Sequence, residues 1–163
     1  MTAQGYERIS APFRTEKRRK LLNWVNSLLT ALCYGAYPAC LAVLAVRRDP
    51  RLVRSVLVPA VSFLLLSAYR NLHNEKRPYE VLDICPLIRK DAKGKSFPSR
   101  HVFSVFVISM TFLWLLPPLG AVFLVMGVGL ALCRVIGGVH WPRDVIVGAA
   151  VGILSGIVGF WFV

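Results

Sequence analysis

Apolar residues fill four long blocks of this 163-residue chain, and the charged residues gather between the blocks. A helix needs about 20 mostly apolar residues to cross a bilayer, and the third block is longer than one such helix. Pro117, Pro118 and Gly120 interrupt that block near its middle, where they predict a tight turn. The four uncharged blocks are 21–46, 55–69, 102–133 and 145–163. They predict five membrane-spanning helices, at about 22–46, 52–72, 101–116, 119–136 and 143–163.

The predicted fold class is therefore all-α, a polytopic membrane helix bundle. Composition agrees, because 56% hydrophobic residues and a mean hydropathy of +0.58 are too high for an ordinary soluble domain. A soluble protein with a large core is disfavoured, since little amphipathic surface would remain to face water. The first block is also longer than the apolar region of a signal peptide. We expect residues 1–20 to form a basic interfacial segment and residues 21–163 to form one transmembrane domain.

The net charge of +12 comes from 20 Lys and Arg residues against 8 Asp and Glu residues. In a membrane protein such an excess is typical of loops on the inner face or of attraction to anionic headgroups. The basic residues are divided among short loops and form no continuous face, so nucleic acid is not an expected partner. The four cysteines lack paired metal-ligand spacing, and three of them lie in apolar blocks, as small core residues do. They are Cys33, Cys40, Cys85 and Cys133.

Three polar clusters lie at the end of the second predicted helix, at the start of the third and at the end of the fourth. An even number of crossings between them places all three on one membrane face. In the first, Arg70 and Arg77 are seven residues apart, about two helical turns, so we expect them to share one helix face that ends before Pro78. Two guanidinium groups on one face suit the binding of a phosphate. The alternative is that they extend to lipid headgroups.

The second cluster is Phe-Pro-Ser-Arg-His at residues 97–101. Pro98 is typical of a helix start, which places Ser99 in the first turn. A helix N-terminus offers unpaired N–H groups and a partial positive charge to an anion. His101 can exchange a proton near neutral pH. The alternative is a serine cap followed by a histidine at the membrane interface.

The third cluster spans residues 133–144. Pro142 is predicted to open the last helix, with Asp144 in its first turn, where the carboxylate can reach back to His140. An imidazole held at one nitrogen presents the other as a nucleophile or base. Gly137 and Gly138 allow a tight turn and a close backbone approach to a ligand. A His-x3-Asp pair by itself is a weak signal.

Taken in order, the patterns Arg-x6-Arg-Pro, Pro-Ser-x-His and Arg-x5-His-x3-Asp resemble those of the type 2 phosphatidic acid phosphatase (PAP2) superfamily, which has the vanadium haloperoxidases as soluble relatives. The resemblance covers about residues 52–163. Arg70 stands where that family usually has Lys, Arg100 where it has Gly, and Cys133 where it has Ser. Arg70 keeps the charge but changes the donor geometry, and Cys133 lacks a hydroxyl donor.

The resemblance implies a phosphatase with a PAP2/haloperoxidase-like helical core. His140 would attack phosphorus and form a phosphohistidine, Asp144 would fix the tautomer of His140, and His101 would protonate the leaving oxygen. The phosphate oxygens would be held by Arg70, Arg77, Ser99 and Arg134. No cofactor or metal ion is expected, because arginines supply the positive charge and the histidines and carboxylates form no metal cage in the sequence.

The implied substrate is a lipid phosphate of the undecaprenyl pyrophosphate, phosphatidic acid or phosphatidylglycerol phosphate class, with membrane lipids as the other partners. The sequence does not choose among these, and it leaves the oligomeric state open. A non-catalytic lipid-phosphate-binding protein is one alternative, although binding alone would need only the cations. A transporter is another, although its charges should lie near mid-membrane and not at helix ends.

Two arguments about membrane orientation conflict. The N-terminal segment, on the same face as the site, has six basic residues against four on the opposite face, which favours a cytoplasmic site. The resemblance implies that the site lies on the outer face of a bacterial plasma membrane. The four basic residues on the opposite face also form a compact cluster, which strongly favours a cytoplasmic position for that face. These four are Arg47, Arg48, Arg51 and Arg54. We therefore expect an extracytoplasmic site.

Overall fold

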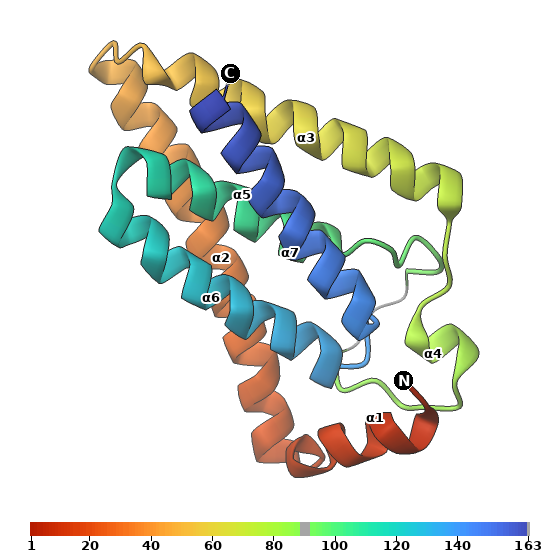
Figure 1. Ribbon diagram of the computed structural model, residues 1–163. Helices are drawn as coiled ribbons and strands as arrows, with labels where there is room; N and C mark the ends of the chain where they lie inside the picture. The colour runs from red at the N-terminus through yellow and green to blue at the C-terminus, as the bar shows by residue number, and fades with distance from the viewer. Residues whose placement is uncertain (89–91, 163) are drawn as a thin grey trace.

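The computed structural model describes residues 1–88 and 92–162, and it confirms the predicted all-helical bundle (Figure 1). The bundle helices are α2 (Glu16–Val46), α3 (Arg51–His73), α5 (Arg100–Leu115), α6 (Pro117–Ile136) and α7 (Pro142–Ile157). Each begins or ends within a few residues of its predicted bounds, except that α2 starts six residues early. A π-helical turn, η2 (Val158–Phe162), extends α7, and the last residue of the fifth predicted helix, Val163, lies outside the described residues.

Helix α5 is the centre of the bundle, and it has the length predicted for it but is shorter than a typical membrane span. Its 16 residues extend about 24 Å, whereas α2, α3, α6 and α7 are long and apolar enough to cross a membrane. Every α5 residue from Val102 to Phe112 is buried, and α2, α3, α6 and α7 all contact this helix. A helix that is apolar on all sides is typical of a protein core or of a membrane span, and α5 occupies the core of this bundle.

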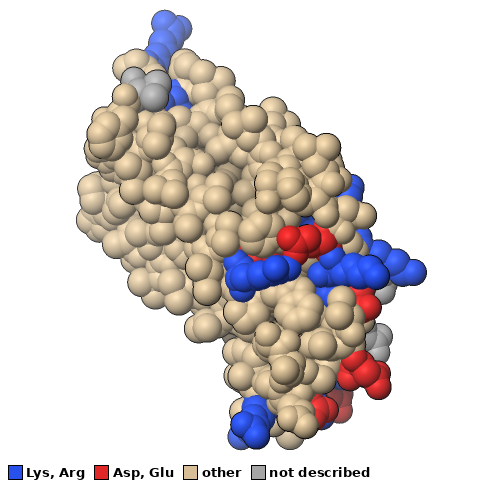
Figure 2. Space-filling model, turned by 45° about the vertical axis from the view of Figure 1, so that its right-hand side comes forward, with Lys and Arg blue, Asp and Glu red and all other residues tan. Residues whose placement is uncertain are grey.

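The outer surface of the bundle is apolar. Figure 2 shows a broad surface without Lys, Arg, Asp or Glu that separates charged side chains near the two ends. Large hydrophobic side chains such as Trp24, Leu65 and Val125 are more than half exposed. Such a surface is unstable in water but suits a bilayer. The chain is therefore an integral membrane protein.

The N-terminal residues form a short helix, α1 (Ala3–Ser10), followed by a 3-10 turn, η1 (Ala11–Phe13). Tyr6 of α1 is fully buried, and its ring lies against Gly138 in the turn between α6 and α7. The Tyr6 hydroxyl donates a hydrogen bond to the carbonyl of Cys85 at 3.2 Å. Because α2 begins at Glu16, the basic residues 17–20 belong to the same helix as the apolar block that follows.

Three glycines of α7 allow this helix to approach α5 closely. A Cβ atom at Gly148, Gly152 or Gly156 would lie within 2.9 Å of an α5 or N-cap atom. Small residues at such contacts let two membrane helices pack backbone to backbone. The contact sets the position of α7 relative to the N-terminus of α5, where the second polar cluster lies.

We predict that Gly152→Ala destabilises the bundle by about 1–3 kcal/mol through overpacking. Its Cβ would lie 2.8 Å from the carbonyl oxygen of Phe103 and 2.9 Å from Cβ of Phe106, and neither atom can move without shifting α5. The measurement is the free energy of unfolding in detergent micelles. Gly35→Ala is the matched control, because no atom lies within 4 Å of the added methyl group. Equal stability of the two variants would contradict the prediction.

Candidate active site

The three polar clusters meet at one end of the bundle, as the parity of crossings predicted. In Figure 1 the C-terminal end of α3, the N-terminal end of α5 and the turn between α6 and α7 lie near one another, with α1 and the four-residue helix α4 (Pro78–Val81) beside them. The α2–α3 turn, the α5–α6 turn and the C-terminus lie at the other end.

The prediction that Arg70 and Arg77 share one helix face is wrong. Helix α3 ends at His73, and Asn74 adopts the left-handed conformation (φ 37°, ψ 44°) that terminates it. Arg77 then occupies the N-cap position of α4, where its N–H donates to the Glu80 carboxylate at 2.7 Å. The reversal at Asn74 brings Arg77 back toward the site by another route, so both side chains are buried there.

The two guanidinium groups hold loop segments in place. Arg70 donates to the carbonyls of Lys95, Ser96 and Pro98. Arg77 donates from Nε to Gly94 at 3.1 Å and from Nη1 to Val139 at 3.0 Å. They are only 4% and 3% exposed, so they do not extend to headgroups. Buried charges need such partners, and the partners are therefore fixed by the arginines.

His140 and Asp144 form a buried pair at the start of α7. Asp144 is in the first helical turn, and its Oδ2 accepts hydrogen bonds from the Trp141 N–H at 3.0 Å and from the Ser96 hydroxyl at 2.5 Å. The same oxygen lies 3.4 Å from Nδ1 of His140. Asp144 is fully buried and His140 is 1% exposed. The carboxylate is thus fixed from three sides, and it orients the imidazole.

Burial lowers the pKa of His140 to about 4, and the positive charges of Arg77 and Arg134 act in the same direction, against the opposing effect of Asp144. The imidazole is consequently neutral at pH 7. With Nδ1–H directed at Asp144, Nε2 carries the free lone pair and can act as a nucleophile or base.

The site has an excess of buried positive charge. Among the described residues, the buried ionised side chains are three arginines and one carboxylate, namely Arg70, Arg77, Arg134 and Asp144. Two buried donors there, Nε of Arg134 and the hydroxyl of Ser99, have no hydrogen-bond partner within the part of the chain that the structure describes. Ser99 is the N-cap of α5, so the unpaired hydroxyl lies at the positive end of that helix. An anion with several oxygens, such as phosphate, would satisfy both the charge and the donors.

His101 occupies a different environment from His140. It lies in the first turn of α5 and is half-buried. Its ring stacks on Tyr34 of α2, with 6.5 Å between centroids and 23° between planes. Tyr34 is also within electrostatic range of Arg134 and Arg100. The ring of His101 therefore lies on the side of α5 that faces α2.

The sequence interpretation missed three residues that shape the site. Ser96 immediately precedes the second motif, and its polarity there was the available signal. Tyr6 and Tyr34 lie outside all three motifs, in helices that carry no polar pattern pointing to the site. Only the packing of α1 and α2 brings their rings to Gly138 and His101.

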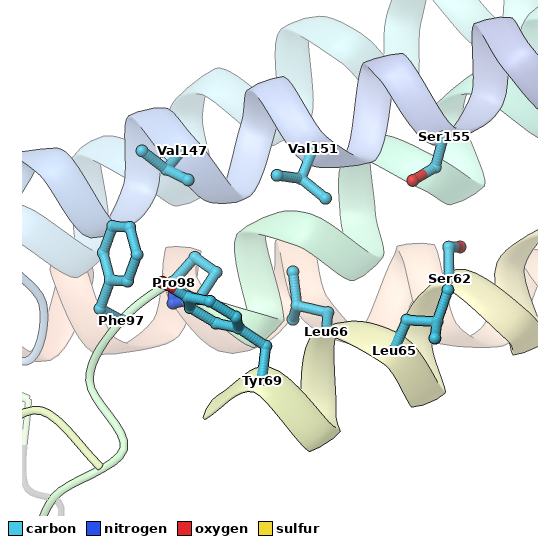
Figure 3. A pocket seen from close by; sticks show the side chains of 9 residues that line it. All are labelled: Ser62, Leu65, Leu66, Tyr69, Phe97, Pro98, Val147, Val151 and Ser155. Carbon is cyan, nitrogen blue, oxygen red and sulfur yellow. The ribbon is translucent and has the colours of Figure 1, made fainter. Parts of the chain in front are cut away.

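Two apolar grooves adjoin the site on either side of α3. One, of about 460 Å³, lies between α2, α3 and α5 and includes Tyr34 and Phe63 in its lining. The other, of about 410 Å³, lies between α3 and α7. Figure 3 shows Leu66 facing Val151 across this second groove, with Tyr69, Phe97 and Pro98 at one end. Both grooves are lined mainly by apolar side chains, as a hydrocarbon chain requires.

Within the described part of the chain, no three His, Cys, Asp or Glu side chains are grouped closely enough to hold a metal ion. The four cysteines are free thiols; Cys33 and Cys133 are buried, Cys40 is partly buried and Cys85 is exposed.

Comparisons with known proteins support the resemblance of the motifs. The family model described as the PAP2 superfamily matches residues 51–163. Bacitracin transport permease protein BcrC of Bacillus licheniformis is 28% identical over 109 residues, which cover 67% of this chain and 54% of BcrC. Putative undecaprenyl-diphosphatase YbjG of Escherichia coli (strain K12) is 32% identical over 108 residues, which cover 66% of this chain and 52% of YbjG. The chain thus matches about half the length of these curated relatives.

Two solved structures share the fold. LpxE of Aquifex aeolicus superposes with a TM-score of 0.75 at 23% identity, over 97% of this chain and 93% of LpxE. A transmembrane PAP2 type phosphatidylglycerolphosphate phosphatase from Bacillus subtilis superposes with a TM-score of 0.64 at 20% identity, over 98% and 92% of the two chains. The whole helical arrangement, including the segment before the family match, is therefore shared with membrane proteins of this type.

We predict that His140 titrates well below the ordinary histidine value of about 6.5. Because the folded state binds the proton more weakly than the unfolded state, this residue makes the unfolding free energy fall as the pH decreases from about 6.5 toward about 4. The measurement is a pH titration of imidazole nuclear magnetic resonances in micelles, with His140→Ala used to assign the signal. A midpoint at or above 6.5 for His140 would contradict the prediction.

Proposed function

The chain belongs to the PAP2 superfamily, and from that premise we propose that it is a lipid phosphate phosphatase that acts through a phosphohistidine intermediate. The observation that carries the proposal is the neutral His140, held by Asp144, next to three buried guanidinium groups with unpaired donors nearby. A nucleophile and an anion site in contact are what phosphoryl transfer requires.

In the first half of the reaction, Nε2 of His140 attacks phosphorus. The N–P bond forms as the bond from phosphorus to the leaving oxygen breaks, and His101 gives a proton to that oxygen. Asp144 stabilises the positive charge that develops on the imidazole, and Ser96 keeps the carboxylate oriented. Proton donation of this kind contributes about 10²–10⁴ in rate.

In the second half, water attacks the phosphohistidine. His101, now without its proton, accepts one from the water as the new P–O bond forms. The N–P bond breaks, its electron pair returns to Nε2, and inorganic phosphate leaves. Both histidines and the carboxylate are then in their starting states, so the cycle is complete without a further reactant.

The phosphate oxygens are bound by Arg77, Arg134 and Ser99, with Arg70 contributing its charge from behind the 95–98 segment that it holds. Nε of Arg134 and the Ser99 hydroxyl have no other hydrogen-bond partner. Donors fixed before the reaction stabilise the charge on the equatorial oxygens at little reorganisation cost. These groups supply the positive charge that a metal ion would otherwise provide, so we propose metal-independent catalysis.

The lipid nature of the substrate follows from the surroundings of the site. The protein is embedded in the membrane, and the site lies at the ends of its helices, at headgroup level. The groove between α2, α3 and α5 starts at Tyr34, whose ring stacks on His101. Since His101 protonates the leaving group, the hydrocarbon chain of a lipid leaving group extends from His101 into this groove. Undecaprenyl pyrophosphate, phosphatidic acid and phosphatidylglycerol phosphate all have the required form.

The test is release of inorganic phosphate from lipid phosphates by the purified protein in detergent and EDTA. We expect the wild type to be active, and we expect His140→Ala to lose at least about a hundredfold in kcat while it remains folded, because the nucleophile is absent. His73→Ala is the matched control, since His73 is exposed at the end of α3 and contacts Tyr69.

Two results would contradict this proposal. Retention of more than a few per cent of wild-type turnover by His140→Ala would remove His140 as the nucleophile. Loss of wild-type activity in EDTA, with recovery on addition of Mg²⁺, would show that catalysis depends on a metal ion.

We further propose that the protein lies in a bacterial plasma membrane with its active site on the extracytoplasmic face. The four arginines near the α2–α3 turn would then be cytoplasmic, as the inside-positive rule favours. In a background without native cysteines, an impermeant maleimide on intact cells is expected to label Lys93→Cys but not Pro50→Cys. Both positions are exposed, at opposite ends of the bundle. Labelling of position 50 alone would reverse the orientation.

A further inference from the structure

Arg100 adds a positive charge to the site at a place where the fold disfavours one. It is the first residue of α5 and its side chain is exposed. A cation in the first turn is repelled by the positive end of the helix dipole. Arg70 and Arg77 lie within electrostatic range and repel it as well. An anionic ligand would turn these three unfavourable interactions into one favourable cluster.

Arg100 lies on the groove side of the buried arginines. Its guanidinium carbon is 5.7 Å from the ring centroid of Phe63, which lines the groove between α2, α3 and α5. Tyr34, which lines the same groove, is within electrostatic range of Arg100. The Ser99 hydroxyl, buried and unpartnered, belongs to the neighbouring residue. An anion bound by Arg100 would thus lie between the reacting phosphate and a hydrocarbon chain in the groove.

We propose that Arg100 determines substrate specificity by binding the inner phosphate of a lipid diphosphate, the phosphate that is attached to the lipid. This inference rests on the proposed phosphatase function. The outer phosphate would be bound by Arg77, Arg134 and Ser99 and attacked by His140, while the lipid chain occupies the groove. The chemical order of chain, inner phosphate and outer phosphate then matches the spatial order of groove, Arg100 and buried arginines.

The chemistry of the leaving group explains why a cation helps at this position. When His140 attacks the outer phosphorus, the bond to the bridging oxygen breaks and a lipid monophosphate leaves. Negative charge grows on that oxygen and on the inner phosphate, where Arg100 stabilises it, and His101 supplies the proton. A lipid monophosphate instead releases a neutral alcohol, which gives Arg100 no anion to stabilise.

Two substrates that carry the same hydrocarbon chain isolate the effect of the second phosphate. The experiment compares kcat/KM for farnesyl diphosphate and farnesyl monophosphate in the wild type and in Arg100→Gln, by phosphate release in detergent. We expect the substitution to lower kcat/KM for the diphosphate by about tenfold or more, which corresponds to about 1.4 kcal/mol. For the monophosphate we expect a change of less than about twofold. Arg100→Lys should retain part of the preference, because it keeps the charge.

Lys76→Gln is the control for loss of one positive charge near the site, since Lys76 is exposed and precedes Arg77 in the chain. It should leave the ratio of the two kcat/KM values unchanged. An equal fall for both substrates in Arg100→Gln, or no fall for either, would overturn the role of Arg100 while leaving the phosphatase function intact. Absence of phosphate release from both substrates by the wild type would overturn the proposed function, and this inference with it.

Discussion

The burial of three guanidinium groups beside a single carboxylate is the interaction on which the rest of the site depends. Buried charges are costly unless they are paired or fully hydrogen-bonded. Arg70 and Arg77 meet this requirement by donating hydrogen bonds to carbonyls of residues 94–98 and of Val139. The loop before α5 and the turn before α7 therefore take up fixed positions. The same positive charge, together with burial, keeps His140 neutral. One electrostatic imbalance therefore shapes the loops, and it underlies both the anion site and the nucleophile that we propose.

Helix packing fixes the position of His140 and Asp144 relative to the start of α5. The N–H of Ser99 donates to the carbonyl of Asp144 at 2.8 Å, and Gly148 lies directly against the backbone of Ser99. The start of α5 and the start of α7 are consequently one unit. The turn at Gly137 and Gly138 is held between Ile88 and Tyr6, and Gly138 has a positive φ of 74°. The N-terminal helix, which precedes the family match, thus supports the turn that carries His140.

The membrane decides which surfaces are available to a substrate. An exposed apolar belt keeps the bundle in the bilayer, and the polar end of the bundle stays at the level of the headgroups. A phosphate can reach the buried arginines only from that end, while a hydrocarbon chain is stable only along the helices. The two apolar grooves beside α3 offer such a place for a hydrocarbon chain. Arg100, the first residue of α5, lies at the boundary of the two environments, as its proposed role in specificity requires.

The sequence by itself determined the helical class, the helix bounds to within a few residues in most cases, and the side of the bundle at which the three motifs meet. These follow from local rules: apolar length, proline and glycine at turns, and the parity of crossings. It also placed Asp144 and His140 four residues apart at a helix start, which is enough for contact. The spacing of Arg70 and Arg77 predicted that one helix carries both residues. The structure differs, because Asn74 adopts the left-handed conformation and ends α3 before Arg77. Only the tertiary structure showed that α5 is the central helix and that Ser96 binds Asp144. It alone showed that Tyr6 and Tyr34 reach the site. Such contacts join residues dozens of positions apart, and their formation depends on how whole helices pack, which no local pattern encodes.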